Sequence, residues 1–335
     1  MTQLIGQEIR LAARPVGEPG PADFELTTAE VPAPADGQVV VRNTWMSVDP
    51  YMRGRMDETS SVLPPFQLGV VLEGSAVGEV IASRAAGVPV GATVSHFLGW
   101  REYAVVDAAA ATVLDTTLAP EQAYLGPLGT TGLTAYAALT DVLRVTGGEV
   151  VFVSAAAGAV GSVAGQLARK LGAARVIGSA GGPLKAKTLL TDFGFDAAID
   201  YRAGDLPGQL AAAAPDGIDV YVDQVGGAHL EAALDHLRVG GRVALVGAIS
   251  GYNATEPQPG PANLAQIVYK SLSLRGLQVT SYFHLFPEYV EQAAGWLADG
   301  SLRTQETVVE GLAQAPDALL GVLRGANTGK MLVRI

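Results

Sequence analysis

The sequence has no cysteine and only four histidines. Without thiols it can form no disulfide bond and no zinc site built on thiolates. The histidines, which show no H-E-x-x-H or H-x-x-x-H spacing, are His96, His229, His236 and His284. We therefore expect packed or surface histidines, and a protein that works without a metal.

Positive charge is also scarce. The 22 lysines and arginines face 33 aspartates and glutamates, so the net charge is −11. An acidic surface argues against nucleic acid and anionic membranes as partners. No apolar run approaches the roughly 18 residues that span a bilayer, and the first residues lack the continuous apolar core of a signal peptide. We expect a cytoplasmic protein with neither nucleic-acid nor membrane partners.

What the chain does have is enough length for two domains, with 335 residues of which 49% are hydrophobic. The first 125 residues are rich in strand patterns, at 37–43, 74–83 and 92–100. From about residue 145 buried strands alternate with helical segments. The expected strands are 149–154, 174–180, 197–201, 219–225, 242–248 and 272–279. This alternation predicts an α/β fold with a doubly wound parallel sheet.

A glycine-rich turn follows the first of these buried strands. It reads Ala156-x-Gly158-x-x-Gly161 and leads into an amphipathic helix. In that context Gly158 lets the backbone approach a pyrophosphate, and Gly161 lets helix and strand pack closely. Ala156 fits the first position if its φ stays negative. The turn predicts a dinucleotide site, and the alternative is a plain turn that binds nothing.

The end of the second strand indicates which nicotinamide cofactor binds. An NAD-specific fold usually places Asp or Glu there, whereas this chain has Ser179, Ala180, Gly181 and Gly182, followed by Lys185. A missing carboxylate and a nearby cation favour the 2′-phosphate of NADP(H). The alternative for Lys185 is a solvated lysine in the first turn of a helix.

Motifs along nearly the whole chain resemble one family. They are SVDPYMRGRM (47–56), GWREYAVV (99–106), LGTTGLTAY (128–136), AAAGAVGSVAGQ (155–166), GFDAAIDY (194–201), DVYVDQVGG (219–227), GAISGYN (247–253) and GANTGKMLV (325–333). Together they resemble the zinc-independent medium-chain dehydrogenase/reductases, in the branch of the prostaglandin, alkenal double-bond and curcumin reductases. The resemblance implies a GroES-like β-rich domain (1–125 and 301–335), a Rossmann NADP-binding domain (126–300), and ligands bound in the cleft between them.

The resemblance also implies cofactor-binding positions. The residues that match the pyrophosphate turn, the 2′-phosphate contacts, the nicotinamide segments and the C-terminal asparagine are Gly158, Ala159, Val160, Gly161, Lys185, Tyr201, Gln224, Val246, Gly247, Ala248, Ile249, Ser250, Leu277, Gln278, Val279 and Asn327. Two departures stand near the expected nicotinamide. Gln224 replaces the usual Asn, and Thr130-Thr131 replaces a Met-Pro pair.

The chemistry implied is reduction of a carbon–carbon double bond conjugated to a carbonyl, in an enal or enone. Hydride would reach the β-carbon, and the enolate oxygen would need preorganised donors and then a proton source. Tyr252 matches the family's active-site tyrosine, and Tyr51 matches a second tyrosine that faces the substrate. A phenol stays protonated at neutral pH and can donate. The alternative for each is a packed tyrosine with a satisfied hydroxyl.

Other functions remain open. A quinone oxidoreductase on the same fold differs only in the hydride acceptor, and an NADPH-binding protein without turnover is a second alternative. A zinc alcohol dehydrogenase is excluded because its cysteine ligands are missing. Arg53 and Arg55, close to Tyr51, could receive a carboxylate or lie solvated. The family is often dimeric through a sheet edge, for which 274–283 is the candidate segment.

Overall fold

The chain divides into two units in the computed structural model, which describes residues 3–59 and 63–335. Unit 1 comprises Met1–Gly126 and Glu306–Ile335, and unit 2 comprises Pro127–Gln305. The boundary at which the chain returns from unit 2 to unit 1 lies between Gln305 and Glu306, whereas the resemblance placed it after residue 300. The units are described in turn.

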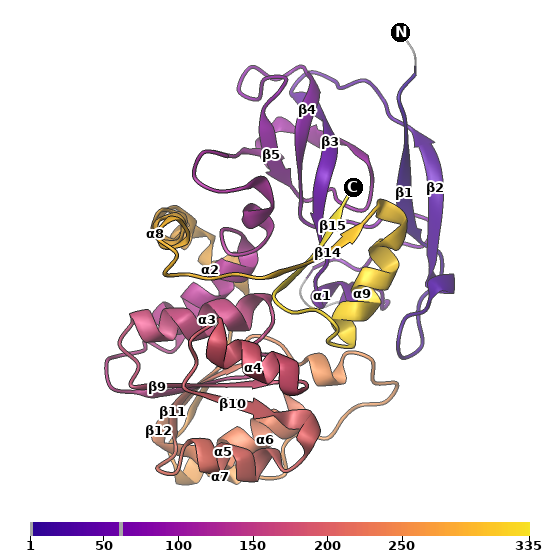
Figure 1. Ribbon diagram of the computed structural model, residues 1–335. Helices are drawn as coiled ribbons and strands as arrows, with labels where there is room; N and C mark the ends of the chain where they lie inside the picture. The colour runs from indigo at the N-terminus through magenta and orange to yellow at the C-terminus, as the bar shows by residue number, and fades with distance from the viewer. Residues whose placement is uncertain (1–2, 60–62) are drawn as a thin grey trace. The chain divides into compact units, whose positions relative to one another are not determined.

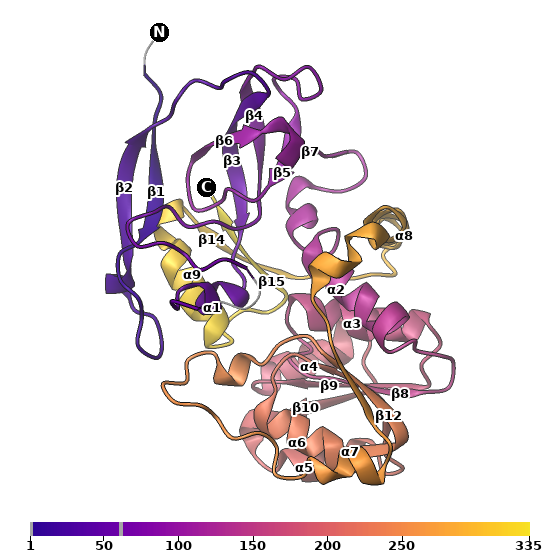
Figure 2. The ribbon, with the colours of Figure 1, turned by 180° about the vertical axis from the view of Figure 1, so that it is seen from behind.

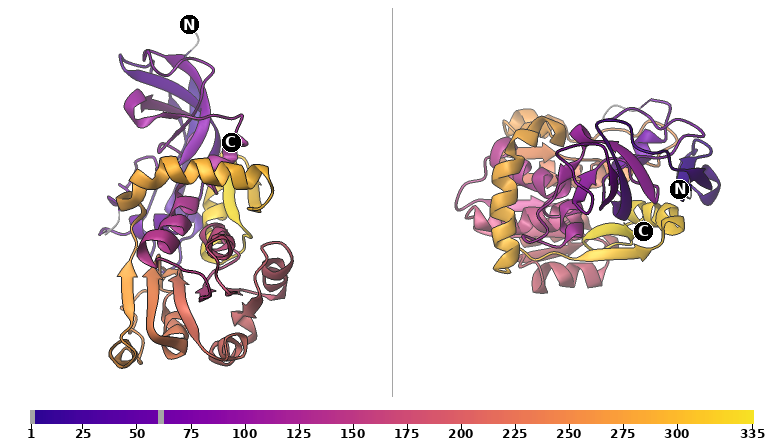
Figure 3. Two further views of the ribbon diagram at one scale, coloured as in Figure 1. Left: turned by 90° about the vertical axis from the view of Figure 1, so that its left-hand side faces the viewer. Right: turned by 90° about the horizontal axis from the view of Figure 1, so that it is seen from above.

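Unit 2 contains a six-stranded sheet in which every pair of neighbours is parallel. Its order is β10-β9-β8-β11-β12-β13. The bounds are β8 Val150–Val153, β9 Arg175–Ala180, β10 Ala197–Asp200, β11 Ile218–Asp223, β12 Leu237–Leu245 and β13 Ser273–Gly276. In the left view of Figure 3 the arrows of the orange strands point the same way. The predicted doubly wound α/β fold is confirmed.

Helices cover both faces of this sheet. Figures 1 and 2 show α3 (Ala159–Lys170) and α4 (Pro183–Thr191) on one side, with α5 (Leu206–Ala213), α6 (Gly227–His236) and α7 (Ala265–Tyr269) on the other. Burial on both faces explains the continuous apolar runs of the strands. The strand bounds lie within two residues of the predicted ranges except in two strands: β12 begins and ends earlier, at Leu237 and Leu245, and β13 ends earlier, at Gly276.

Three further helical segments of unit 2 pack beside α3. They are α2 (Thr130–Ala137), the π-helical turn η4 (Ala138–Val142) and α8 (Phe286–Ala298). The buried Tyr289 hydroxyl on α8 donates to the carbonyl oxygen of Pro127, 2.6 Å away. Gly132 is required at this crossing, because a Cβ there would lie 2.0 Å from that same carbonyl oxygen.

Unit 1 is β-rich, as the sequence predicts. One sheet has the order β14-β15-β3-β4-β5-β7, with β6 paired to β3, and β1 and β2 form a separate antiparallel pair. The bounds are β1 Ile5–Leu11, β2 Phe24–Glu30, β3 Gln38–Ser47, β4 Ala76–Ser83, β5 Thr93–His96, β6 Tyr103–Asp107, β7 Thr112–Val113, β14 Glu306–Glu310 and β15 Lys330–Arg334. The helices of unit 1 are α1 (Tyr51–Arg55) and α9 (Ala315–Leu323).

The C-terminal segment of the chain is built into the sheet of unit 1. Strand β15 pairs antiparallel with the end of β3, with Leu332 opposite Ser47, and β14 pairs parallel with β15. Figure 1 shows α9 beside these yellow strands, and its apolar residues share a core with Met46, Met52 and Trp100. Within residues 3–59 and 63–335, no helix is long and apolar enough to cross a membrane.

Candidate active site

The predicted cofactor residues of unit 2 come together because they follow parallel strands. Carboxyl ends of parallel strands meet at one edge of a sheet, where open α/β proteins bind their ligands. The glycine turn follows β8, Lys185 follows β9, Tyr201 follows β10, Gln224 follows β11, the 246–250 segment follows β12 and Leu277 follows β13. All six strand ends therefore contribute to one candidate site.

The glycine turn has the geometry of a phosphate-binding turn. The positive φ falls on Ala155 (47°), so Ala156 is spared it. Gly158 is the N-cap of α3, and a Cβ on Gly161 would lie 2.5 Å from the carbonyl oxygen of Ala155. The N–H groups of Ala159, Val160 and Gly161 have no carbonyl one turn earlier in the helix. A pyrophosphate fits such donors.

Two cations and a tyrosine gather around the turn after β9. Lys185 is the third residue of α4, and Tyr201 begins the 3-10 turn η5 (Tyr201–Ala203) after β10. A Cβ on Gly181 would lie 2.8 Å from the Tyr201 hydroxyl and 2.9 Å from Arg202 Nε. Burial, and then the Arg202 cation, lowers the pKa of the Lys185 ammonium group. Positive charge is thus concentrated beside a helix N-terminus, which suits a bound phosphate.

Arg202 is a candidate residue that sequence reasoning missed. Asp200 fixes its backbone, because one oxygen of that carboxylate accepts from the backbone N–H of Gly182 (2.7 Å) and from that of Arg202 (3.0 Å). These two hydrogen bonds to Asp200 connect the turn after β9 with the turn after β10. The only sequence signal was its place directly after Tyr201.

A buried carboxylate organises the turn after β11. One oxygen of Asp223, which is fully buried, accepts from the Tyr221 hydroxyl at 2.7 Å and from the N–H groups of Val225 and Gly226. The side chain of Gln224 points back, since its Nε2 donates to the Ser154 carbonyl oxygen at 2.6 Å. Gln224, which stands where the family usually has Asn, therefore links the ends of β8 and β11.

The backbone of this turn holds the segment that leads to Tyr252. The carbonyl oxygen of Asp223 accepts from the N–H of Val246 (2.7 Å), and that of Val225 accepts from Ser250 Oγ (2.6 Å). Ile249 and Ser250 lie in the 3-10 turn η6 (Ile249–Gly251), which Tyr252 follows. The Tyr252 hydroxyl oxygen accepts from the N–H of Ala248 at 3.4 Å. Its own proton is thereby left for another acceptor.

The end of β13 departs from a simple strand. The N–H of Leu277 donates to the Leu245 carbonyl oxygen at 2.9 Å, and Val279 begins the 3-10 segment η7 (Val279–Leu285). Gln278 between them is exposed. Thr130 and Thr131 open α2, which packs against η7. The second departure from the family pattern thus lies next to this predicted nicotinamide segment.

The other two predicted residues belong to unit 1. Tyr51 is the first residue of α1, and its hydroxyl is buried without a hydrogen-bond partner among the described residues. Burial, reinforced by Asp49, raises the pKa of Tyr51 well above the usual value. Asn327 lies between α9 and β15 and donates from Nδ2 to the Gly329 carbonyl oxygen at 2.7 Å. The phenol therefore stays protonated, and Asn327 shapes the turn before β15.

The arginines beside Tyr51 are structural. Arg53 and Arg55 are only 3% and 4% exposed, so neither is solvated. Arg53 donates to the Gly17 carbonyl oxygen and to Asp57. Arg55 donates to the Pro64 carbonyl oxygen and to Glu73, and its guanidinium stacks 4.1 Å from the Phe66 ring centroid. These contacts hold α1 in unit 1.

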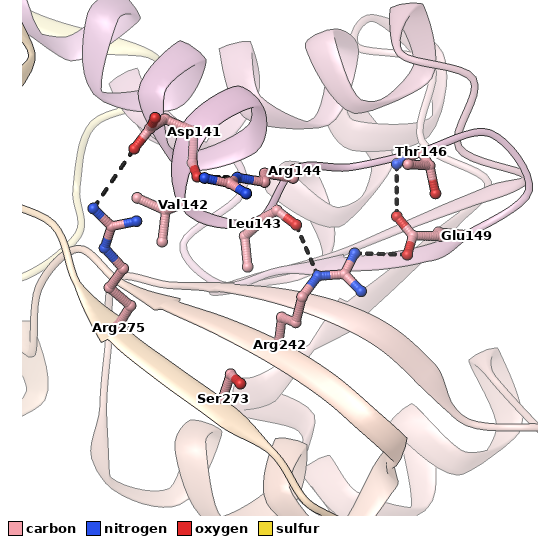
Figure 4. A pocket seen from close by; sticks show the side chains of 9 residues that line it. All are labelled: Asp141, Val142, Leu143, Arg144, Thr146, Glu149, Arg242, Ser273 and Arg275. Carbon is pink, nitrogen blue, oxygen red and sulfur yellow. Dashed lines mark hydrogen bonds and ion pairs between the residues drawn. The ribbon is translucent and has the colours of Figure 1, made fainter.

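A separate pocket of about 420 Å³ is lined by residues at the end of η4 and in the segment that follows it, together with Arg242 of β12 and Ser273 and Arg275 of β13 (Figure 4). Its arginines are engaged by neighbours: Arg242 pairs with Glu149 at 2.6 Å, and Arg275 with Asp141 at 3.6 Å. None of the predicted site residues lines it. In residues 3–59 and 63–335 no cluster of three or more histidine, aspartate or glutamate side chains could hold a metal.

Two family models match the chain. An "N-terminal domain of oxidoreductase" matches residues 7–114, and a "zinc-binding dehydrogenase" matches residues 159–297. Among the relatives, the NADPH-dependent curcumin reductase of Escherichia coli (strain K12) is 37% identical over 97% of this chain and 95% of its own length. The NADP(+)-dependent 2-alkenal reductase of Nicotiana tabacum is 36% identical over 99% and 98%.

A solved structure agrees with these relatives. The crystal structure of CurA in complex with NADPH from Vibrio vulnificus has a TM-score of 0.93, 39% identity, and 98% coverage of both chains. With this fold and these relatives, the chain is an oxidoreductase. It belongs to the medium-chain dehydrogenase/reductase family, in the branch of the curcumin, alkenal and prostaglandin reductases. The resemblance drawn from the motifs is confirmed.

Proposed function

We propose that the enzyme uses NADPH to reduce the carbon–carbon double bond of α,β-unsaturated aldehydes and ketones. Its class is established, since it is an NADP-dependent oxidoreductase. One observation supports the substrate class most directly. The sheet edge that carries the phosphate turn also carries Tyr252, whose hydroxyl proton is not used by Ala248. Such a donor suits an oxygen that becomes negative during the reaction.

The residues at this edge fit the cofactor. The first turn of α3 would hold the pyrophosphate, and Lys185, Tyr201 and Arg202 would hold the 2′-phosphate. Gln224, the 246–250 segment and 277–279 would border the nicotinamide, with Asn327 as a further contact. The glycines support this assignment, because a Cβ on Gly161 would collide with the backbone of the phosphate turn and a Cβ on Gly181 would collide with Tyr201 and Arg202. When bound, NADPH supplies the hydride for the β-carbon.

The chain's own residues would then handle the oxygen and the proton. Tyr252 donates a hydrogen bond to the carbonyl oxygen as it becomes an enolate, either directly or through a ribose hydroxyl, and can relay a proton. Tyr51 orients the substrate with its own hydroxyl. Both phenols suit this work because they are donors at neutral pH. Ordinarily one such donor accounts for about 100- to 1,000-fold in rate.

Three further properties belong to this proposal. The reaction needs no metal, which the absence of cysteine supports. The enzyme works in the cytoplasm. It forms a homodimer through 274–283, because β13 is an edge strand of its sheet and exposed edges are ready to pair. Size-exclusion chromatography with light scattering would test the last point, and a monomer would contradict it.

A turnover panel tests the function. Purified enzyme is given NADPH or NADH with a 2-alkenal, an aryl enone such as curcumin, a simple quinone, or NADP(+) with a primary alcohol, and nicotinamide absorbance is followed. We expect turnover of the alkenal and enone with NADPH, insensitive to metal chelators. Faster turnover of the quinone would favour the quinone oxidoreductase, and tight NADPH binding without any turnover would favour a non-catalytic binding protein.

A further inference from the structure

A buried ion pair in unit 1 joins the last strand of the chain to the residues before Tyr51. Lys330, the first residue of β15, is 4% exposed, and its Nζ donates to Asp49 Oδ1 at 2.7 Å and to the Val48 carbonyl oxygen at 3.2 Å. The Asp49 side chain is itself 14% exposed. Its other carboxylate oxygen accepts from Ser47 Oγ.

Stability alone does not explain such a pair. Removing two charges from water costs free energy that their attraction and hydrogen bonds barely return, and apolar side chains of similar volume are often as stabilising. What charged groups add is direction, because each hydrogen bond fixes the position of its partner. The question is therefore what the pair positions.

The contacts converge on three consecutive residues that lead into α1. Leu332 pairs with Ser47, the N–H of Val48 faces the Met331 carbonyl oxygen at 3.5 Å, and Lys330 holds both Val48 and Asp49. The Asp49 carbonyl oxygen then accepts from the N–H of Met52 at 3.1 Å, inside the first turn of α1. Any shift of Asp49 would be passed to that turn.

Tyr51 stands in the same turn. Its ring packs against the core of unit 1, and its hydroxyl makes no hydrogen bond to any residue in the described parts of the chain. No polar contact fixes the hydroxyl, so its position depends on this packing and on the helix that carries it, whose entry is held by Lys330 and Asp49. A buried donor without a partner is costly unless a ligand completes it.

We propose that the Lys330–Asp49 pair is a positioning device that holds the Tyr51 hydroxyl where it meets the substrate's carbonyl group. Lys330 and Asp49 act through Tyr51 and touch no reacting atom. This inference rests on the role given to Tyr51 under the proposed function. It assigns a task to the C-terminal strand that goes beyond closing the sheet of unit 1.

Mutational coupling tests it. In the double variant Lys330→Met/Asp49→Asn both charges are removed together, so no lone charge stays buried. We expect kcat/KM for an enone to fall about 10- to 100-fold, the effect of a small misplacement of a reacting partner. Tyr51→Phe should cause at least as large a fall, because it removes the hydroxyl altogether. Adding the double variant to Tyr51→Phe should cause no further loss, whereas the Kd for NADPH, measured by fluorescence titration, should stay unchanged throughout.

A charge pair of unit 1 that lies outside α1 provides the control. Arg42 on β3 pairs with Glu79 on β4 at 2.5 Å, and Arg42→Met/Glu79→Gln should leave kcat/KM unchanged in the parent and in the Tyr51→Phe background alike. If the Lys330/Asp49 variant does not fold, Ser47→Ala removes only one bond to Asp49 and should give a smaller fall, again absent in the Tyr51→Phe background.

The outcomes separate two failures. Suppose that Tyr51→Phe lowers kcat/KM. If the Lys330/Asp49 variant then leaves kcat/KM unchanged, or lowers it by the same factor with and without Tyr51→Phe, the positioning role is wrong and the proposed function stands. If Tyr51→Phe leaves the rate unchanged, the orienting role of Tyr51 is wrong, and the inference falls with it.

Discussion

At the scale of single residues, the hydroxyl of Tyr252 separates reaction from binding. The hydroxyl oxygen accepts from the Ala248 N–H at 3.4 Å, so the free enzyme loses only this modest contact when the hydroxyl is removed. During the reaction the same change would remove a hydrogen-bond donor to the developing oxyanion. We expect Tyr252→Phe to lower kcat for a 2-alkenal about 100-fold or more, with NADPH affinity unchanged by fluorescence titration.

The control for this variant is Tyr269→Phe. Tyr269 is 76% exposed on α7 and belongs to no predicted contact. It should behave as the parent enzyme does. Full activity in Tyr252→Phe would show that another group stabilises the oxygen.

The second residue-scale prediction concerns cofactor choice. Arg202 and Lys185 place two cations beside Gly181, and a 2′-phosphate would receive charge-assisted hydrogen bonds from both. Because each such bond contributes about 1.5–3 kcal/mol, Arg202→Gln or Lys185→Met should weaken NADPH binding about 10- to 100-fold. NADH, which lacks the phosphate, should bind as before. Isothermal titration with 2′,5′-ADP and AMP gives the same comparison without turnover.

Arg238→Gln serves as its control. Arg238 pairs with Asp219 at 2.8 Å and precedes the central part of β12, away from the carboxyl ends. The Arg238→Gln substitution removes one positive charge from the same unit and should leave the preference for NADPH over NADH unchanged. Equal losses for NADPH and NADH in Arg202→Gln would mean that Arg202 supports the fold and does not read the phosphate.

At the scale of elements, the turn between β8 and α3 is packed too tightly for an added side chain at the proposed phosphate-binding position. A Cβ on Gly161 would lie 2.5 Å from the Ala155 carbonyl oxygen and 2.7 Å from Ala156 Cα, both backbone atoms. The start of α3 would have to move. We expect Gly161→Ala to lower the free energy of unfolding by about 1–3 kcal/mol and to weaken NADPH binding, as measured by chemical denaturation and titration.

Gly295 offers the matched substitution. It lies within α8 of the same unit, and nothing stands within 4 Å of its added Cβ. Alanine should stabilise this helix by roughly 0.5–1 kcal/mol, since glycine loses more freedom on folding. Destabilisation of both variants alike would contradict the steric explanation.

The elements of unit 2 were predictable because parallel strands leave a strong pattern. Runs such as Val150–Val153 and Ile218–Asp223 are buried on both faces, so their apolar character is continuous. Strands β1 and β2 gave no such signal. Their exposed and buried residues mix, and their pairing joins residues as far apart as Ile5 and Glu30. Long-range pairing of this kind is not encoded in local periodicity.

Side-chain environments were harder to predict than strands. The partners of Arg53 and Arg55 include Gly17 and Glu73, which only the fold brings near. From the sequence alone, two arginines close together on a short segment therefore suggested solvated side chains. Arg202 was missed for the same reason, because its significance comes from its closeness to Gly181, on a different strand end.

At the scale of the whole molecule, the chain uses its first and last segments to build one unit and its middle to build the other. The proposed cofactor positions lie mainly in the middle, while Tyr51 and its proposed anchor Lys330 lie in the outer segments. Conditions that loosen unit 1 should therefore lower activity before they lower cofactor affinity. Buried titratable groups show which conditions those are.

His96 is such a group. It is 7% exposed at the end of β5, where its Nδ1 accepts from the N–H of Leu98 (3.0 Å) and its Nε2 faces Asn43 Oδ1 (2.9 Å). This arrangement requires the neutral ring with the proton on Nε2. Burial, and then the Arg101 cation, lowers the pKa of His96 from 6.5 to about 4.

The sign of the resulting pH dependence follows from linkage. Below about pH 6.5 the unfolded chain binds a proton at this histidine that the folded chain refuses until about pH 4. Stability is therefore complete above pH 6.5 and falls as the pH drops between these values. From pH 7 to pH 5 the loss should be about 2 kcal/mol, measured by urea denaturation at each pH.

His96→Gln keeps a donor for Asn43 but cannot titrate. It should be less stable at pH 7 and lose about 2 kcal/mol less than the parent on going to pH 5, and an equal loss in both proteins would show that other groups carry the acid sensitivity.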